Sequence, residues 1–209
     1  MSCEKIVVSQ VKPGQTGSNL FGWYRSGIIS FGNRLFKGII RFMGQRREAR
    51  ERAVQFLFQH DLNPPENLEE ALTHFWITQQ ATAIAGEKAG ATWGQEVELP
   101  PPTTEELSTQ LFADKLIRGV LEHRDELDGK IKQHAENWDL HRMAVVDRNI
   151  LRLAIYEMLH REDIPPIVSI NEAVDIAKKF STQDSGKFVN GILDRIKGEL
   201  MRPARIVKL

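Results

Sequence analysis

The residues most suited to chemistry lie in the stretch FSTQDSGKFVNGILD, at positions 180–194. Asp184 fits the N-cap of a helix, because its carboxylate can accept hydrogen bonds from the free N–H groups of the first turn. Lys187 and Phe188 follow in that turn. A cation, an aromatic ring and a helix start together suit a phosphate group and a stacked base. An ordinary capped helix with a core phenylalanine has the same features, so this stretch alone leaves both interpretations open.

A second group of cations, Arg46, Arg47 and Arg50, lies at the start of an expected helix. Spacings of three and four residues predict that these side chains line one exposed stripe. Guanidinium groups can make bidentate contacts with phosphates, and each neutralised phosphate releases counterions. The alternative interpretation is a solvated arginine face on a surface helix.

The six histidines and the single cysteine form no recognisable metal-binding or catalytic motif. The histidines lack the spacing of a motif such as HExxH, and Cys3 alone cannot form a disulfide within the chain or a cysteine-based zinc site. His160 lies near Glu162 and Asp163 at a helix end, where a cation offsets the helix dipole. We therefore expect surface or capping roles for the histidines, and no metal, cofactor or nucleophile–base pair.

The composition is that of a soluble globular protein, with 209 residues, 41% hydrophobic and 27% charged. This length supports one domain, or a domain with an appendage. A single cysteine fits a reducing, cytoplasmic setting, and no apolar run reaches the roughly 18 residues of a membrane span. Positions 1–52 hold ten Lys and Arg against three acids, which leaves +7 there and −7 in the remainder. This asymmetry indicates a polyanion at one end and a basic partner elsewhere.

Positions 20–43 have the pattern of a basic amphipathic helix, in which apolar residues recur at helical spacing opposite Arg34, Lys37 and Arg41. Three interpretations stay open for this segment. It is an extra helix docked on the main domain, a helix that binds a membrane surface or a partner, or a cleaved targeting segment.

Six further helices are expected, and prolines or glycines separate most of them. They cover positions 45–62, 68–85, 104–137, 143–160, 167–180 and 184–200, with Thr104 as an expected N-cap and a loop over 86–103. No segment alternates with the period of two that a half-buried strand requires. The sequence therefore predicts an all-α fold.

Three blocks in this order resemble the NusB family of transcription antitermination and ribosomal RNA processing factors. They are RREARERAVQFLFQHDL (46–62), VVDRNILRLAIYEM (145–158) and IPPIVSINEAVDIAKKFSTQDSGKFVNGILD (164–194). The likeness covers about residues 46–200 and is weakest across 63–106. It implies two packed three-helix bundles over 45–200, preceded by a basic extension (1–44) and followed by a tail (201–209). It also implies no catalysis, and binding of boxA-type RNA together with NusE, a small-subunit ribosomal protein, within the RNA polymerase antitermination complex.

The resemblance also implies roles for particular positions. The positions that match RNA contacts in the family are Arg46, Arg47, Arg50, Lys187 and Phe188, and Asp184 matches an acid beside that surface. We expect the arginine stripe and the Lys187–Phe188 turn to form one RNA-binding surface. Glu48 departs from the more basic family pattern.

On the partner side, Asp147 matches an acid that the family uses against NusE, and Arg148, Arg152 and Tyr156 continue along the same helix. Tyr156 is equally suited to the core, and Asp147 could instead pair with an arginine in solvent.

Two other functions compete with this one. NusB-like domains also form the N-terminal part of some ribosomal RNA cytosine methyltransferases, but these need a following α/β domain, and only nine residues follow Leu200. A membrane-associated interaction module would depend on positions 20–43 alone. A homodimer that hides the RNA-binding face is a further state that occurs among relatives.

Overall fold

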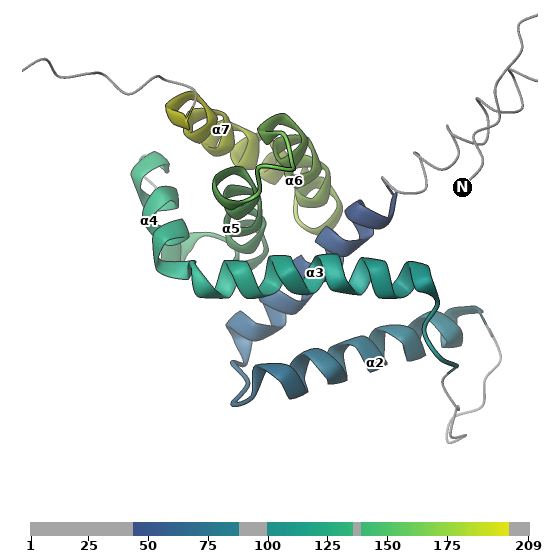
Figure 1. The fold of residues 1–209 in the computed structure, drawn as a ribbon. Helices are drawn as coiled ribbons and strands as arrows, with labels where there is room; N and C mark the ends of the chain where they lie inside the picture. The colour runs from purple at the N-terminus through teal and green to yellow at the C-terminus, as the bar shows by residue number, and fades with distance from the viewer. Residues whose placement is uncertain (1–43, 88–99, 136–138, 201–209) are drawn as a thin grey trace, which may run out of the picture. The chain divides into compact units, whose positions relative to one another are not determined.

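Helices make up every regular element of residues 44–87, 100–135 and 139–200, the parts of the chain that the computed structural model describes (Figure 1). The all-α prediction is therefore confirmed. Three predicted segments lie outside the described residues: the amphipathic helix over 20–43, the extension (1–44) except residue 44, and the tail (201–209). Their roles stay predictions. None of the described helices combines the length and the apolar content that a bilayer crossing requires.

The first bundle consists of the 44–62 helix, α2 (Leu68–Glu87) and α3 (Thr104–Glu122). The first of these ends at Leu62, and Asn63 then precedes two prolines that cannot continue a helix. Phe56 and Phe75 pack edge to face, with ring centroids 5.4 Å apart. The indole of Trp76 donates a hydrogen bond of 2.8 Å to Asp114, which joins α2 to α3. Buried aromatic and polar contacts thus hold these three helices together.

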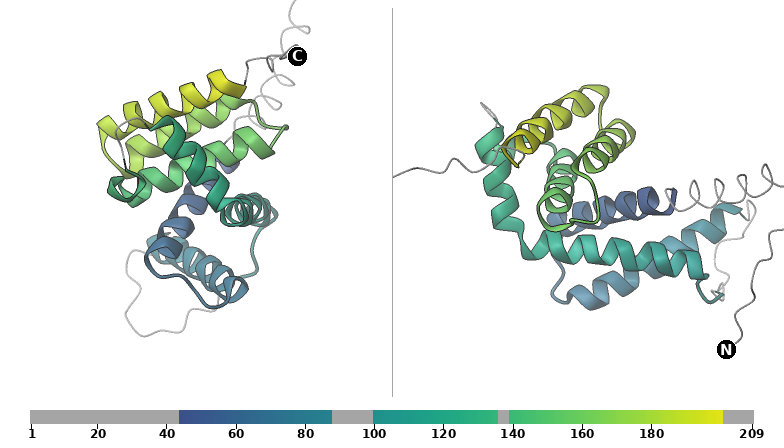
Figure 2. Two further views of the ribbon diagram at one scale, coloured as in Figure 1. Left: turned by 90° about the vertical axis from the view of Figure 1, so that its left-hand side faces the viewer. Right: turned by 45° about the horizontal axis from the view of Figure 1, so that its top comes forward.

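The second bundle consists of α5 (Val145–His160), α6 (Pro166–Phe180) and α7 (Gln183–Leu200). A helix α4 (Arg124–His134) and a short 3₁₀ helix (Leu140–Arg142) connect the two bundles. The central element is α5, which packs against α3, α4, α6 and α7 and has fully buried Leu151 and Ile155 (Figure 2). The two packed three-helix bundles predicted from the sequence are confirmed.

The single long helix predicted over 104–137 is wrong, because the chain breaks at His123. His123 has φ −98° and ψ 16°, and its N–H still donates to the carbonyl of Gly119, so it ends α3 and precedes α4. The break lets Leu127 and Ile131 of α4 enter the core. The N-cap of α3 is Thr103, in a capping box with Glu106, and not Thr104.

The N-cap of α7 also lies earlier than predicted, by two residues, at Thr182 instead of Asp184. Helix α7 begins at Gln183, and the Ser185 N–H donates to Thr182 Oγ1 at 3.1 Å, while the Thr182 N–H donates to Ser185 Oγ at 3.4 Å. Thr182 therefore caps the helix through a reciprocal pair. Asp184 lies inside the first turn, where its charge faces the positive end of the helix dipole without capping it.

Candidate nucleic-acid interface

The expected stripe of three exposed arginines is wrong for Arg50. Its side chain is only 3% exposed, and its Nε donates at 2.8 Å to Glu157 on α5, a residue with no exposed surface. Glu157 accepts a second hydrogen bond, of 2.7 Å, from Ser169 Oγ. Arg50 therefore joins the 44–62 helix to α5 and is not positioned to bind a phosphate. Its spacing from Ala53, Val54 and Leu57 by three, four and seven residues already placed it on the apolar face.

Arg46 and Arg47 lie nearer the surface, but both contact other side chains. The guanidinium of Arg46 lies over the ring of Phe112, 5.2 Å from its centroid. Arg47, 47% exposed, donates to Glu172 at 3.0 and 2.8 Å and to Asp175 at 2.9 Å. The hydrogen bond with Glu172 raises the pKa of the Arg47 guanidinium above its ordinary value. Arg47 is thus a surface cation already paired with two carboxylates of α6.

The first turn of α7 presents Lys187 and Asp184 to solvent. Their side chains are 82% and 91% exposed and lie 3.3 Å apart. Phe188 is partly buried against the core. The last turn of α6 adds Lys178 and Lys179, which the sequence argument missed although KKF at 178–180 resembles the KF at 187–188. A Cβ on Gly186 would lie 3.0 Å from the stem of Lys178, so this glycine lets α7 pack closely against the end of α6.

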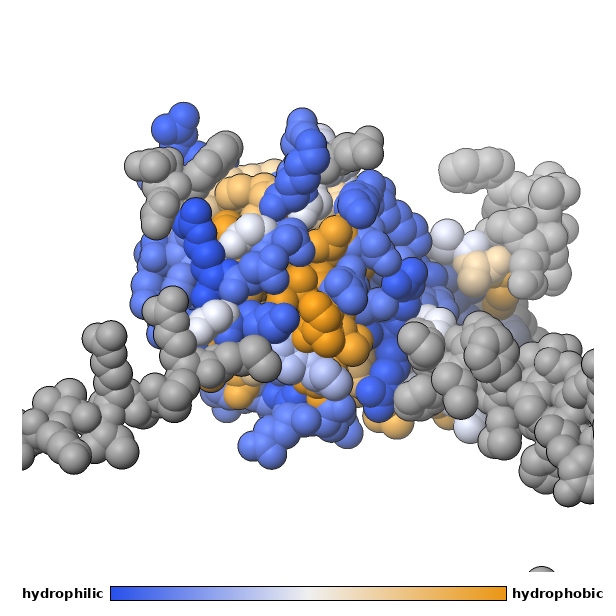
Figure 3. Space-filling model, turned by 90° about the horizontal axis from the view of Figure 1, so that it is seen from above, coloured by the Kyte–Doolittle hydropathy of each residue, from blue (hydrophilic) through white to orange (hydrophobic). Residues whose placement is uncertain are grey.

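Ion pairs order these cations along α6. Arg47 pairs with residues in the middle of α6, and Lys179 in its last turn pairs with Glu51 at 2.6 Å. Asp175 and Phe180 are five residues apart, about 7.5 Å along a helix axis. The cations therefore follow one another from the middle of α6 to the first turn of α7, and we call Arg47, Lys178, Lys179 and Lys187 the basic edge. Figure 3 views the molecule from the side of α6 and α7, where hydrophilic residues surround a hydrophobic strip.

Asp147, expected to face a protein partner, is buried instead. Its side chain accepts a hydrogen bond of 2.9 Å from Ser185 Oγ in the first turn of α7. Its other oxygen, Oδ1, is buried and has no hydrogen-bond partner among the described residues. Asp147 therefore stabilises the N-terminus of α7 through this buried hydrogen bond, at the α7 end of the basic edge.

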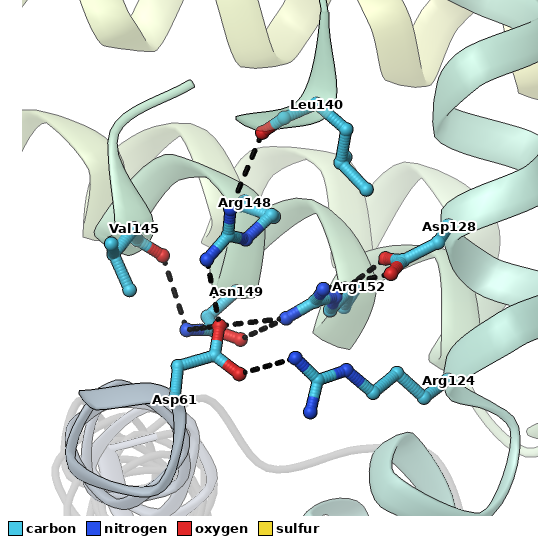
Figure 4. Close-up of polar contacts among 8 residues, drawn as sticks. All are labelled: Asp61, Arg124, Asp128, Leu140, Val145, Arg148, Asn149 and Arg152. Atoms are coloured by element: carbon cyan, nitrogen blue, oxygen red, sulfur yellow. Dashed lines mark hydrogen bonds and ion pairs between the residues drawn. The ribbon is translucent and has the colours of Figure 1, made fainter. Parts of the chain in front are cut away.

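Arg148 and Arg152 belong to a buried network between the bundles (Figure 4). Asp61, at the end of the 44–62 helix, accepts from Arg124 at 2.8 Å, Arg148 at 3.1 Å and Arg152 at 2.8 Å. Arg152 also makes a bidentate pair with Asp128 of α4, at 2.6 and 2.8 Å. Asp61 and Arg152 side chains are each only 3% exposed. The expectation that Arg152 lies on an exposed partner face is therefore wrong.

The charges and hydrogen bonds of this network shift the pKa values of Asp61 and Arg152. Burial alone would raise the pKa of Asp61, but the charges of Arg152 and Arg124 outweigh it and hold that pKa below its ordinary value. Burial would likewise lower the pKa of Arg152, and the hydrogen bond with Asp128 raises it instead. Both shifts favour the charged forms of Asp61 and Arg152. We call the network of Asp61, Arg124, Asp128, Arg148 and Arg152 the bundle clamp.

Tyr156, the last predicted partner residue, is partly buried on the core side of α5. A Cβ on Gly119 would lie 2.0 Å from the Tyr156 ring, so α5 packs on α3 at this glycine. Asp147, Arg152 and Tyr156 thus contact three different neighbours inside the fold.

Comparison with known proteins agrees with this architecture. Residues 47–197 match the model of the NusB family. The chain belongs to the NusB family. The transcription antitermination protein NusB of Symbiobacterium thermophilum is 44% identical over 151 residues, 72% of this chain and 88% of that protein. NusB of Bacillus subtilis is 42% identical over 156 residues, 75% of this chain and 97% of that protein.

Solved NusB structures have the same fold. NusB of T. maritima superposes with a TM-score of 0.55 and 38% identity, over 74% of this chain and 91% of that one. NusB in a crystal structure of the antitermination factors NusB and NusE with double-stranded RNA superposes with a TM-score of 0.53 and 27% identity. That match covers 75% of this chain and 98% of the other.

Proposed function

We propose that this NusB-family chain is a non-enzymatic transcription antitermination factor. It binds boxA-type RNA together with the ribosomal protein NusE, within the RNA polymerase antitermination complex, and supports transcription and processing of ribosomal RNA. The observation that carries the proposal is the basic edge, a row of exposed cations in a family with a member crystallised with NusE and RNA. Its three lysines lie in the last turn of α6 and near the start of α7, and Phe188, partly buried against the core, follows Lys187 in the sequence.

The ion pairs of the basic edge explain how it can exchange ligands. Arg47, Lys179 and Lys187 each pair with a carboxylate, and the cations of these pairs are about half to largely exposed. Surface salt bridges contribute only about 0–1 kcal/mol, so a phosphate can replace a carboxylate at little cost. The displaced acids remain nearby and repel the RNA, which keeps the affinity of the edge modest. Joint binding with NusE raises the overall affinity without a new contact to RNA.

The partner NusE is a basic ribosomal protein, and the −7 charge of positions 53–209 suits it. Asp147, Arg148, Arg152 and Tyr156 lie in or against the packed interior of the bundles. In this proposal they influence NusE binding by fixing the position of α5, and contact with NusE falls to residues around them.

The proposal is tested by the salt dependence of RNA binding. Fluorescence anisotropy of labelled boxA RNA is measured with the full chain, with and without NusE, between 50 and 200 mM salt, a range of roughly fourfold over which counterion release is large. The variant replaces three lysines, Lys178→Ala, Lys179→Ala and Lys187→Ala. Losing three phosphate contacts to a single strand lowers the slope of log K against log salt by about 2.

A matched control removes three lysines elsewhere, Lys115→Ala, Lys132→Ala and Lys197→Ala, and carries the same net charge. It should keep the parental slope, and both variants should melt within a few degrees of the parent. An equal loss of slope in both variants would show that net charge, and not the basic edge, binds the RNA. An unchanged slope in the first variant would contradict the proposal.

A further inference from the structure

Three side chains with metal-ligating atoms meet at the corner between α3 and α4. They are His123 at the break, Glu126 one turn later, and His160 at the end of α5. Their ligand atoms all lie within 4.8 Å of one another. The two histidines are far apart in sequence, so no spacing motif could have indicated the cluster.

Both imidazoles point at the same carboxylate oxygen. His123 Nδ1 and His160 Nε2 each lie 3.2 Å from Glu126 Oε2. The two rings are stacked, with centroids 4.1 Å apart and planes at 23°. A single cation held between the nitrogens and the carboxylate would satisfy all three groups.

Neighbouring residues fix the orientation of the rings. Tyr156 stacks on His160, with centroids 5.3 Å apart and planes at 27°, and lies 5.9 Å from the His123 ring. Tyr156 in turn fits against Gly119, where a Cβ would overlap its ring. The His123 N–H donates to the Gly119 carbonyl at 3.0 Å. The backbone break and the glycine thus hold both imidazoles toward Glu126, which is the preorganisation that a metal site requires.

We infer that His123, Glu126 and His160 form a binding site for a divalent ion of the zinc class. Two imidazoles and one carboxylate form a donor set that Zn²⁺ prefers, whereas Mg²⁺ prefers oxygen ligands and retains its water. Zn–N bonds of about 2.0–2.1 Å in a tetrahedral site need the two nitrogens roughly 3.3 Å apart. Binding of the ion would require rotation of the side chains out of the observed ring stack to reach that distance, and water would take the fourth position.

The ion would join the α3–α4 corner to the end of α5, close in sequence to Arg124 and Asp128 of the Asp61 network. His123 belongs to the α3–α4 corner, and His160 ends α5 of the second bundle. An ion that binds only the folded chain raises its thermal stability by mass action. This inference does not depend on the proposed RNA-binding function, and each can fail without the other.

The test is calorimetric titration of the full chain with ZnCl₂, combined with thermal melting in ZnCl₂ or MgCl₂. Every protein carries Cys3→Ser, because a thiol would bind zinc independently. The variants are Glu126→Gln and His160→Gln. The control is His134→Gln, because His134 forms a histidine–glutamate pair with Glu199, 2.7 Å apart, outside the cluster.

We expect one zinc ion per chain and a rise in melting temperature with ZnCl₂ that MgCl₂ does not produce. Glu126→Gln and His160→Gln should each weaken zinc binding by more than about tenfold, the lower limit for loss of even an outer-shell partner. His134→Gln should bind as the parent does. Zinc binding that survives both cluster variants, or that depends on His134, would overturn the inference. The inference would also be overturned if ZnCl₂ did not raise the melting temperature of the parent more than MgCl₂ does, while Glu126→Gln folds as the parent does.

Discussion

The cations of the bundle interface and those of the basic edge have different roles in this molecule. In the bundle interface, Arg50 and Arg152 are almost fully buried and pair with buried carboxylates. On the basic edge, Arg47, Lys179 and Lys187 are about half to largely exposed, and their partners range from the largely covered Glu172 and Glu51 to the exposed Asp175 and Asp184. The charge is the same, but both members of a pair are buried only in the first region, where removal of one leaves the other as an unpaired buried charge.

Burial therefore decides which arginines of this chain can bind a phosphate. A buried pair cannot release its guanidinium without exposing the partner carboxylate to an apolar environment. An exposed pair exchanges freely with solvent and with other anions. The comparison therefore assigns the bundle clamp to stability and the basic edge to nucleic acid.

The largest expected effect is the loss of the clamp. Arg152→Ala leaves Asp61 and Asp128 without their shared guanidinium, and we expect the free energy of unfolding to fall by about 3–5 kcal/mol. Urea denaturation followed by circular dichroism measures this change. The matched control is Arg118→Ala, which removes an exposed pair with Glu69 and should cost about 1 kcal/mol or less. Equal losses in the two variants would erase the distinction between buried and exposed arginines.

A second expected effect is on the pH dependence of stability. Asp61 has a pKa below its ordinary value in the folded state, so its contribution is present above the ordinary carboxyl pKa of about 3.9 and is lost as pH falls through the folded pKa. Asp61→Asn should therefore flatten the fall of unfolding free energy in acid. Urea titrations at several pH values below 5 measure it.

Asp114 provides the opposite case for the same measurement. Burial raises the pKa of Asp114, so its protonation in acid favours the folded state. Asp114→Asn should make the loss of stability in acid steeper. Changes of the same sign in the two variants would contradict the assigned pKa directions.

The sequence predicted the helices best where a residue forces a boundary. Pro64 and Pro165 mark helix ends, and the apolar periodicity gave the all-α fold. The break at His123 has no such residue, because it follows from the packing of α4 on α5 and α7. Local spacing shows that Arg46, Arg47 and Arg50 share a helix turn and that Arg50 lies on its apolar side, but the partner of Arg50, Glu157, lies more than a hundred positions away. Long-range pairs of this kind cannot be read from a single sequence.

The smallest expected effects separate capping from charge at the α7 N-terminus. Thr182→Ala removes the cap and should cost about 1 kcal/mol of unfolding free energy. Asp184→Asn keeps the cap and removes the acid beside Lys187, so stability should change little. Its affinity for boxA RNA should rise about two- to fivefold, which corresponds to about 1 kcal/mol or less between exposed charges. Chemical denaturation and anisotropy measure the two quantities, and weaker RNA binding by Asp184→Asn would argue against RNA at this turn.

Hydrogen–deuterium exchange of the full chain with and without boxA RNA tests the central assignment most directly. Exchange reports local opening of each helix and needs no substitution. The account predicts that RNA slows exchange in the last turn of α6 and the first two turns of α7, and leaves the interior of α5 unchanged. Protection confined to α2 and α3, with none at the α6–α7 junction, would contradict it.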